Sequence, residues 1–166
     1  MRHAFFFLVV LALASAKCSL QMPDRPARQI VCGILEELLV FNATGCKTDF
    51  TNSGTELSNG FRGIGAGIKA KSTKAIKNGL VLVGTGLRDI NRGLNDCGIT
   101  SGVSIVANGA VSFSSGIAVI TQTVKILIRG ENIYNDIWDI YTLDQAADYD
   151  AVGHKLVHLL KLIVAR

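Results

Sequence analysis

The spacing of apolar residues between positions 76 and 97 is the feature that most constrains the fold. Successive apolar positions alternate steps of four and three residues along this stretch: Ile76, Leu80, Val83, Leu87, Ile90, Leu94 and Cys97. An α-helix completes a turn in about 3.6 residues, so this spacing places all of these side chains on one helical face, whereas a strand requires alternation with a period of two. The pattern predicts one long helix that buries a single apolar face.

Apolar residues repeat at helical spacing in other parts of the chain as well. We expect helices over about residues 27–41, 57–68, 76–97, 103–127, 133–140 and 148–165. Ser72 or Thr73 is suited to cap the start of the long helix, and Gly98 is suited to end it. The predicted fold is therefore all-α, a compact antiparallel bundle of about five or six helices.

Residues 99–124 carry a conflicting signal. They are uncharged and rich in Val, Ile, Ser, Thr and Gly, a composition that favours strand over helix. We give precedence to the helical periodicity of the apolar residues. Because several poor helix formers cluster at 112–115, we expect a break there.

The first residues of the chain predict export. Ala4 to Ala14 is an apolar run too short to span a bilayer, and small residues at Ala14 and Ala16 fit a cleavage site for signal peptidase. We therefore interpret residues 1–16 as a signal peptide and residues 17–166 as a single helical domain. The predicted location is extracellular or the lumen of the endomembrane system, with an uncleaved membrane anchor as the alternative.

Four cysteines lie in the predicted mature part: Cys18, Cys32, Cys46 and Cys97. An even number of cysteines in an oxidising compartment predicts two disulfides, and the sequence leaves three pairings open. We favour Cys46 with Cys97 and Cys18 with Cys32. A zinc site is disfavoured because no CxxC spacing is present.

Asn42 begins the sequence Asn-Ala-Thr, which is an acceptor site for N-glycosylation. It falls where the first predicted helix ends. A glycan on an accessible turn and an unmodified polar turn are both consistent with this position.

Glycines recur at intervals of seven residues along three of the predicted helices. The sets are Gly60 and Gly67; Gly79, Gly86 and Gly93; and Gly102, Gly109 and Gly116. Seven residues are about two helical turns, so each set lies on one side of its helix and allows a neighbouring backbone to approach closely. Tight antiparallel packing is the interpretation we prefer, and membrane insertion of the uncharged residues 98–124 is the alternative.

Charge is segregated along the chain. A basic region between residues 60 and 92 includes a predicted basic surface of four lysines: Lys69, Lys71, Lys74 and Lys77. Residues 131–150 contain six acidic residues and no Lys or Arg. The two regions are suited to self-association, although two solvated helix faces explain them equally simply. The lysines also suit anionic lipid or an acidic glycan, whereas nucleic acid is disfavoured by the compartment and by the lack of interleaved aromatics.

No established catalytic motif is present. We therefore expect that the protein is not an enzyme and that it binds no metal ion or cofactor. The nearest approach to a metal pattern is Asp150, His154 and His158, spaced four residues apart on the last helix, where a solvated polar face is an equally good explanation. Tyr134 and Trp138, with Tyr141 one turn on, form an aromatic stripe. We assign this stripe to the core, with sugar stacking or a membrane interface as alternatives.

Several segments resemble a family of uncharacterised secreted helical proteins of protists, chiefly ciliates. The similar segments are Cys32–Leu35, Gly45–Asp49, Leu94–Cys97, Leu127–Ile137 and Asp148–Gly153. The chain departs from that family in having Val157 where a second glycine is common, and in its glycine-rich middle helices. The resemblance implies an all-α secreted fold and supplies no activity.

The sequence therefore favours a secreted, non-enzymatic helical protein with an interaction or structural role. Self-association or a secreted protein partner would be compatible with this role. The alternative is a membrane-active or lipid-binding protein that uses its glycine-rich central helices.

Overall fold

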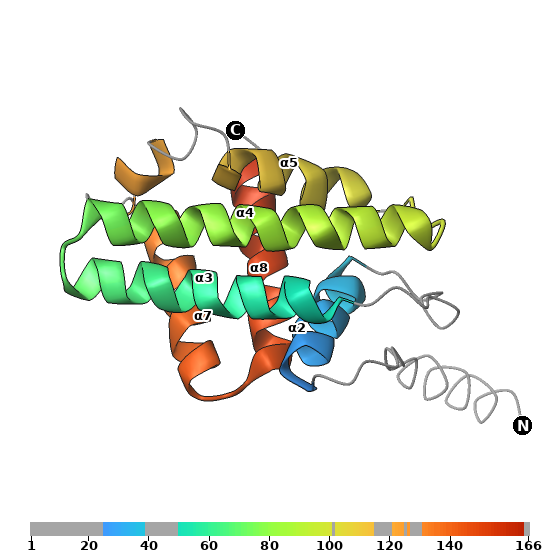
Figure 1. Cartoon of the computed structure of the whole chain (residues 1–166), viewed down its shortest axis with the longest axis horizontal. Helices are drawn as coiled ribbons and strands as arrows, with labels where there is room; N and C mark the ends of the chain where they lie inside the picture. The colour runs from blue at the N-terminus through green and yellow to red at the C-terminus, as the bar shows by residue number, and fades with distance from the viewer. Residues whose placement is uncertain are drawn as a thin grey trace, which may run out of the picture.

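The computed structural model describes residues 25–38, 50–100, 102–114, 121–124, 126 and 131–164. All regular structure in these residues is helical, as predicted. Six helices have twelve or more residues: α2 (Arg25–Glu37), α3 (Thr51–Lys69), α4 (Thr73–Asp96), α5 (Val103–Ser114), α7 (Glu131–Gln145) and α8 (Tyr149–Val164) (Figure 1).

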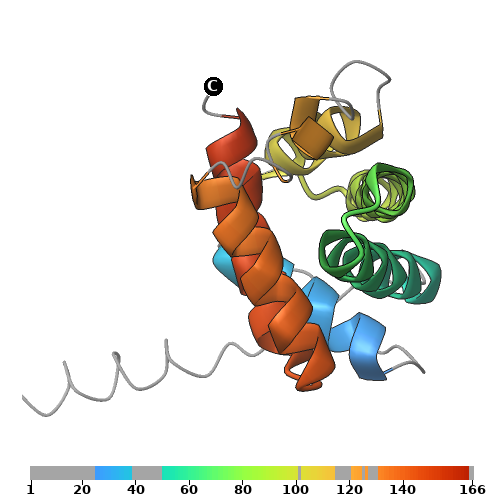
Figure 2. The ribbon, with the colours of Figure 1, turned by 90° about the vertical axis from the view of Figure 1, so that its left-hand side faces the viewer.

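The helices form two layers that cross one another. In one layer α3 and α4 run antiparallel, and α5 packs beside α4 (Figure 1). In the other, α7 and α8 form a hairpin that lies across the first layer, as the view along α3 and α4 shows (Figure 2). α2 packs against both α8 and α3. The neighbouring helices α3 and α4, and likewise α7 and α8, are antiparallel as expected, but the crossing of the layers departs from a simple antiparallel bundle.

The long helix predicted from apolar spacing is confirmed as α4. Its six aliphatic positions from Ile76 to Leu94 are fully buried, and Cys97 packs partly buried against the same core. The Ser72 side chain caps the helix by accepting a hydrogen bond of 3.3 Å from the backbone N–H of Ala75.

Gly98 ends α4 as predicted, in a left-handed conformation with φ 70°. The Ile99 N–H donates to the Leu94 carbonyl and the Gly98 N–H donates to that of Asn95, both at 2.9 Å, which is the Schellman arrangement. α7 ends in the same way without a glycine, because Ala147 adopts φ 58° in the equivalent position. A search for glycine stops therefore misses this helix end.

The register of glycines is confirmed for the contact between α3 and α4. A methyl group added at Gly60 would lie 2.8 Å from the Gly79 carbonyl oxygen, and one added at Gly79 would lie 2.6 Å from that of Gly60. The prediction is wrong for Gly102, which precedes α5 and has φ 75°, so it forms a turn. Gly109 packs against the Leu160 side chain of α8, and Gly116 lies outside the described residues.

Helix ends match the predictions less closely than helix positions do. The first helix starts two residues earlier than expected, at Arg25, and α5 continues through 112–114, where a break was predicted, to Ser114, the last described residue before position 121. Val124 was expected in the core but is 49% exposed. No helix among the described residues is long and apolar enough to cross a membrane.

Several predicted features lie outside the described residues: the signal peptide 1–16, Cys18, Asn42 and Cys46. Cys32 and Cys97 are described, and neither is a free thiol. The pairing of the four cysteines stays a prediction.

Candidate functional site

The polar face of α8 is the most highly connected set of charged side chains in the described part of the chain. Sequence spacing places His154, Lys155, His158 and Lys161 opposite the helix's apolar face. Because α8 packs between α2 and α7, these side chains meet acidic groups on both sides. His154 and Lys161 turn toward α2, whereas Lys155 and His158 turn toward α7.

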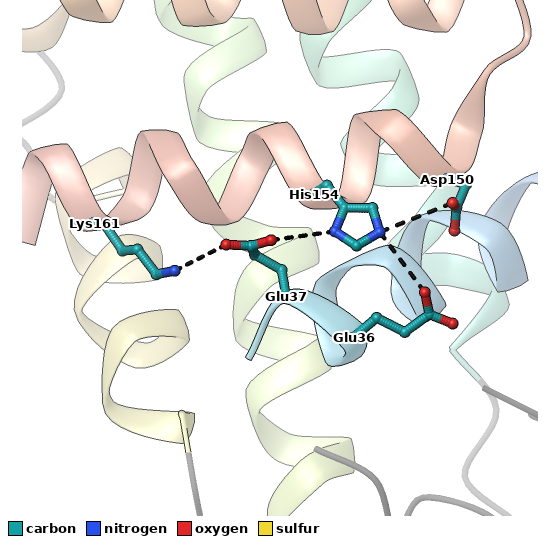
Figure 3. A network of polar contacts seen from close by, with 5 residues as sticks. All are labelled: Glu36, Glu37, Asp150, His154 and Lys161. Carbon is teal, nitrogen blue, oxygen red and sulfur yellow. Dashed lines mark hydrogen bonds and ion pairs between the residues drawn. The ribbon is translucent and has the colours of Figure 1, made fainter. Parts of the chain in front are cut away.

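On the α2 side, two glutamates at the helix end meet α8 (Figure 3). The carboxylate of Glu37 accepts a hydrogen bond from Lys161 Nζ at 3.0 Å and lies 3.3 Å from His154 Nδ1. The other imidazole nitrogen, Nε2, lies 3.7 Å from Glu36 Oε2 and 3.9 Å from Asp150 Oδ2. Three carboxylates and one lysine therefore surround His154.

The contact between the glutamates of α2 and His154 of α8 depends on two glycines, Gly33 and Gly153, at the point where the two helices cross. A methyl group at Gly153 would collide with the Ile30 carbonyl oxygen of α2, and one at Gly33 would collide with the Asp150 carbonyl oxygen of α8. Because glycine has no methyl group at these positions, the two backbones can touch. His154 follows Gly153 directly, so the close crossing brings its ring to the glutamates about one turn beyond Gly33.

The pKa of Glu37 is lowered, chiefly by its hydrogen bond to Lys161. Desolvation opposes this shift, and His154 adds to it. Glu37 is therefore held as a carboxylate and is fixed between two groups of α8.

On the α7 side, Lys155 Nζ lies 2.9 Å from Asp136 and 3.0 Å from Asp139. The hydrogen bonds that Lys155 donates to these two aspartates raise the pKa of Lys155. The buried Asp136 also lies 2.7 Å from His158 Nδ1. His158 therefore belongs to a different cluster from His154, and the predicted trio of Asp150, His154 and His158 is not brought together.

Asp144 provides an ion pair between the acidic and the basic regions. This buried carboxylate accepts hydrogen bonds from Ser58 Oγ at 2.6 Å and from Arg62 Nε at 2.5 Å, linking α7 to α3. The hydrogen bond raises the pKa of Arg62. A cavity of about 250 Å³ adjoins the pair and is lined by Pro26, Ala27, Gly54, Thr55, Ser58, Asn59, Arg62 and Tyr149.

The aromatic stripe lies at the edge of the core rather than inside it. Tyr134, Trp138 and Tyr141 are each partly buried, and the first two rings are parallel with centroids 6.3 Å apart. Lys69 Nζ lies 4.9 Å from the centroid of the Tyr141 ring and donates a hydrogen bond to its hydroxyl. One lysine of the predicted basic surface is thus held by this stripe.

The other three lysines of that surface, Lys71, Lys74 and Lys77, are exposed and form no ion pair with any described residue. Two of them lie on the outer face of α4, which also exposes two arginines at its far end, Arg88 and Arg92. The middle of this face carries the partly exposed apolar residues Val81 and Leu82, at 39% and 40% exposure. We call this surface the α4 basic face and define it by Lys71, Lys74, Lys77, Val81, Leu82, Arg88 and Arg92.

A comparison with known protein families identifies the family of this chain. The family described as secreted protein B-like (SctB-like) matches residues 28–165, which span α2 to α8. The chain belongs to the secreted protein B-like family. No curated protein and no solved structure matches it.

Membership of the secreted protein B-like family agrees with the predicted export, and the structure agrees with the predicted all-α fold. The family name describes secreted proteins, as the predicted signal peptide requires, and the described part of the chain is all-helical. The resemblance is thus confirmed at the level of a secreted family, while a protist origin stays a prediction.

Sequence reasoning missed Glu36 and Glu37. One signal was available, because two adjacent acids at the C-terminal end of a helix oppose the helix dipole and need a partner elsewhere. That the partner would be His154 was not accessible from spacing, since Glu37 and His154 are 117 residues apart.

Proposed function

We propose that this chain is an exported, non-enzymatic helical protein that acts by binding an acidic partner through its α4 basic face. The observation that carries the proposal is the difference in how the two charged regions are used. Asp136, Asp139 and Asp144 are paired inside the molecule, whereas Lys71, Lys74 and Lys77 are directed to solvent without an ionic partner among the described residues.

This difference favours an external partner over self-association of the two regions. A second copy would have to compete with intramolecular pairs for the carboxylates of α7, and buried or partly buried pairs are costly to break. The full sequence carries a formal net charge of +4, and removal of the predicted signal peptide with Arg2 leaves +3, so an acidic polymer outside the cell would also be attracted at long range. An acidic polysaccharide is the partner class that we favour.

Lipid binding is the second candidate, and a specific observation supports it. Val81 and Leu82 interrupt the cationic groups on the α4 basic face, and an apolar centre with basic flanks suits an anionic membrane surface. Gly109 argues against membrane insertion of residues 98–124, because it packs against the Leu160 side chain of α8 inside the fold.

Heparin, used as a sulfated polysaccharide probe, tests the main proposal. We expect the secreted protein to bind immobilised heparin and to elute at a raised salt concentration that falls in the variant Lys74→Gln/Lys77→Gln. The matched control is Arg25→Gln/Arg28→Gln, which removes the same charge from α2. Equal losses in both variants would indicate a net-charge effect and contradict a defined surface.

Two further experiments distinguish lipid binding and self-association from the main proposal: vesicle binding and a measurement of molecular mass in solution. Binding to vesicles that contain phosphatidylserine, without binding to heparin, would favour the lipid candidate. A dimer by light scattering that dissociates on raising the salt concentration would favour self-association.

The modifications expected from the sequence form part of the same proposal. We propose cleavage after Ala16, two disulfides with Cys46 joined to Cys97 and Cys18 to Cys32, and a glycan on Asn42. Peptide mass mapping of the secreted protein under non-reducing conditions reports all three. A different pairing would correct the disulfide assignment without affecting the binding surface.

A further inference from the structure

The polar cluster between α2 and α8 brings together three side chains that could bind a metal ion. Nε2 of His154 is 3.7 Å from Glu36 and 3.9 Å from Asp150, which is too long for hydrogen bonds. Yet one ligand atom from each of these three residues lies within 4.8 Å of the others. The three groups therefore converge on a common point, and the contacts of Glu36 and Asp150 with His154 are ion pairs longer than hydrogen bonds (Figure 3).

Such separations are close to those found around a metal ion. Nitrogen and oxygen ligands lie about 2.1 Å from a tetrahedral zinc ion, which places them roughly 3.4 Å from one another. Small side-chain movements would bring Glu36, Asp150 and His154 to that spacing. Imidazole with two carboxylates is also a donor set that suits zinc.

The other side of the imidazole supplies a second, independent observation. Glu37 lies 3.3 Å from His154 Nδ1 and is itself held by Lys161 at 3.0 Å. In the neutral ring, a carboxylate at Nδ1 favours the tautomer with its proton on Nδ1, which leaves the lone pair of Nε2 directed toward Glu36 and Asp150. Metal-binding histidines are commonly oriented by a carboxylate in this way.

We propose that Glu36, Asp150 and His154 bind one divalent cation of the zinc type, with Glu37 as the positioning residue. The side chains are 35%, 51% and 37% exposed, so the site is open to solvent and leaves room for water as a further ligand. The ion would offset the repulsion between the carboxylates and join the end of α2 to the start of α8. It would therefore act as a clamp across the glycine crossing, a role separate from the α4 basic face.

Titration of the purified, oxidised secreted protein with ZnCl₂ tests the site by calorimetry. We expect saturable binding of one ion per chain and a rise in melting temperature with zinc concentration. His154→Gln should weaken binding at least tenfold, and Glu37→Gln should weaken it by about tenfold or more while the ligands are retained.

His158→Gln is the matched control, because His158 lies one turn further along α8 and pairs with Asp136 instead. It should retain the affinity of the unmodified protein. Should a variant fail to fold, the NMR signals of the two histidine rings in the mature protein, His154 and His158, give the same information, with a selective zinc-dependent shift for His154. Lack of stoichiometric binding, unchanged affinity in His154→Gln, or equal loss in His158→Gln would each overturn the proposal.

Discussion

In the turn between α7 and α8, Ala147 adopts a left-handed backbone conformation, which is energetically unfavourable for any residue except glycine. Its φ of 58° lies in the left-handed region, where Cβ approaches the following carbonyl and costs about 1 kcal/mol. This conformation is stabilised because the backbone N–H groups of Ala147 and Asp148 donate hydrogen bonds of 3.1 and 3.0 Å to carbonyl groups in the last turn of α7. The Asp148 carboxylate in turn accepts from the Ala151 N–H at the start of α8.

We therefore predict that Ala147→Gly raises the free energy of unfolding by about 0.5–1 kcal/mol, even though glycine increases the freedom of the unfolded chain. Chemical denaturation monitored by circular dichroism measures the change. Ala146→Gly is the control, because Ala146 does not have a positive φ, and it should be neutral or destabilising. A loss of stability in Ala147→Gly would contradict the assigned turn.

Glu56 is a partly buried carboxylate whose pKa is raised, first by desolvation and then by the nearby charge of Asp89. The folded state therefore holds the Glu56 proton more tightly than the unfolded chain does. This contribution to stability is fully present below the unfolded pKa, near 4.5, and is lost as pH rises through the raised folded pKa. One oxygen of Glu56 is buried and has no hydrogen-bond partner among the residues that the structure describes.

We predict that Glu56→Gln increases stability at pH 7 by about 0.5 kcal/mol, the scale of a partly exposed polar substitution. The gain should shrink as pH falls toward 4.5. Urea unfolding at a series of pH values measures it. Asp96→Asn, at the exposed end of α4, is a control that should show little of this pH dependence. A pH-independent difference for Glu56→Gln would refute the electrostatic cause.

At the scale of elements, the close contact between α2 and α8 depends on Gly33 and Gly153. A Cβ at Gly153 would also lie 2.8 Å from the backbone nitrogen of Ile34 and 2.9 Å from the Gly33 Cα atom. These are main-chain atoms, which cannot rotate away as a side chain does. The helices would have to separate, and separation would expose neighbouring core residues.

Gly153→Ala should therefore destabilise the protein by about 2–3 kcal/mol, even though alanine is the better helix former. Gly63→Ala provides the matched control, because its added methyl group would meet the Gly79 Cα atom at an ordinary 3.5 Å. That control should be neutral or more stable by up to about 1 kcal/mol. Thermal melts of both variants measure the contrast, and equal behaviour would show that the α2–α8 crossing is looser than described.

The positions of the helices could be predicted from the sequence because apolar spacing records which face each helix buries. Ile76 through Leu94 illustrate this, since their spacing is a local property that no distant contact has to supply. Helix ends such as Ala147 were less predictable, because backbone hydrogen bonds rather than residue type select that conformation. The Gly33–Gly153 crossing was missed, since neither glycine belongs to a seven-residue series.

At the scale of the whole molecule, the candidate site was predicted only in part. His154 and Asp150 could be placed together because they are one helical turn apart. The fold supplies Glu36 and Glu37 from the other end of the described chain and moves His158 to a separate cluster with Asp136. Which helices pack together is decided by the crossing of two layers, and single-sequence periodicity carries no information on that choice.

The same dependence on distant contacts applies to the stability of the helices. α3 contains five glycines and α4 contains four, each of which costs up to about 1 kcal/mol of helix propensity relative to alanine. The glycines allow α3 and α4 to approach closely, but the hairpin alone leaves uncovered the faces that pack on α2, α5 and α7. Packing by the rest of the chain must therefore compensate for the low intrinsic helicity.

We predict that a peptide of residues 50–98 is mostly unfolded in water, although it contains the most regular helical pattern in the sequence. Its helical signal by far-ultraviolet circular dichroism should be less than about half that of the same residues in the folded chain, with no cooperative melt. Replacing Gly63 by Ala in the peptide should raise its helicity slightly, because that glycine is not required by the contact. A peptide that is fully helical and melts cooperatively would show that the α3–α4 hairpin is an independent folding unit, and the crossing layer would then be an addition to a stable core rather than the condition for its helices.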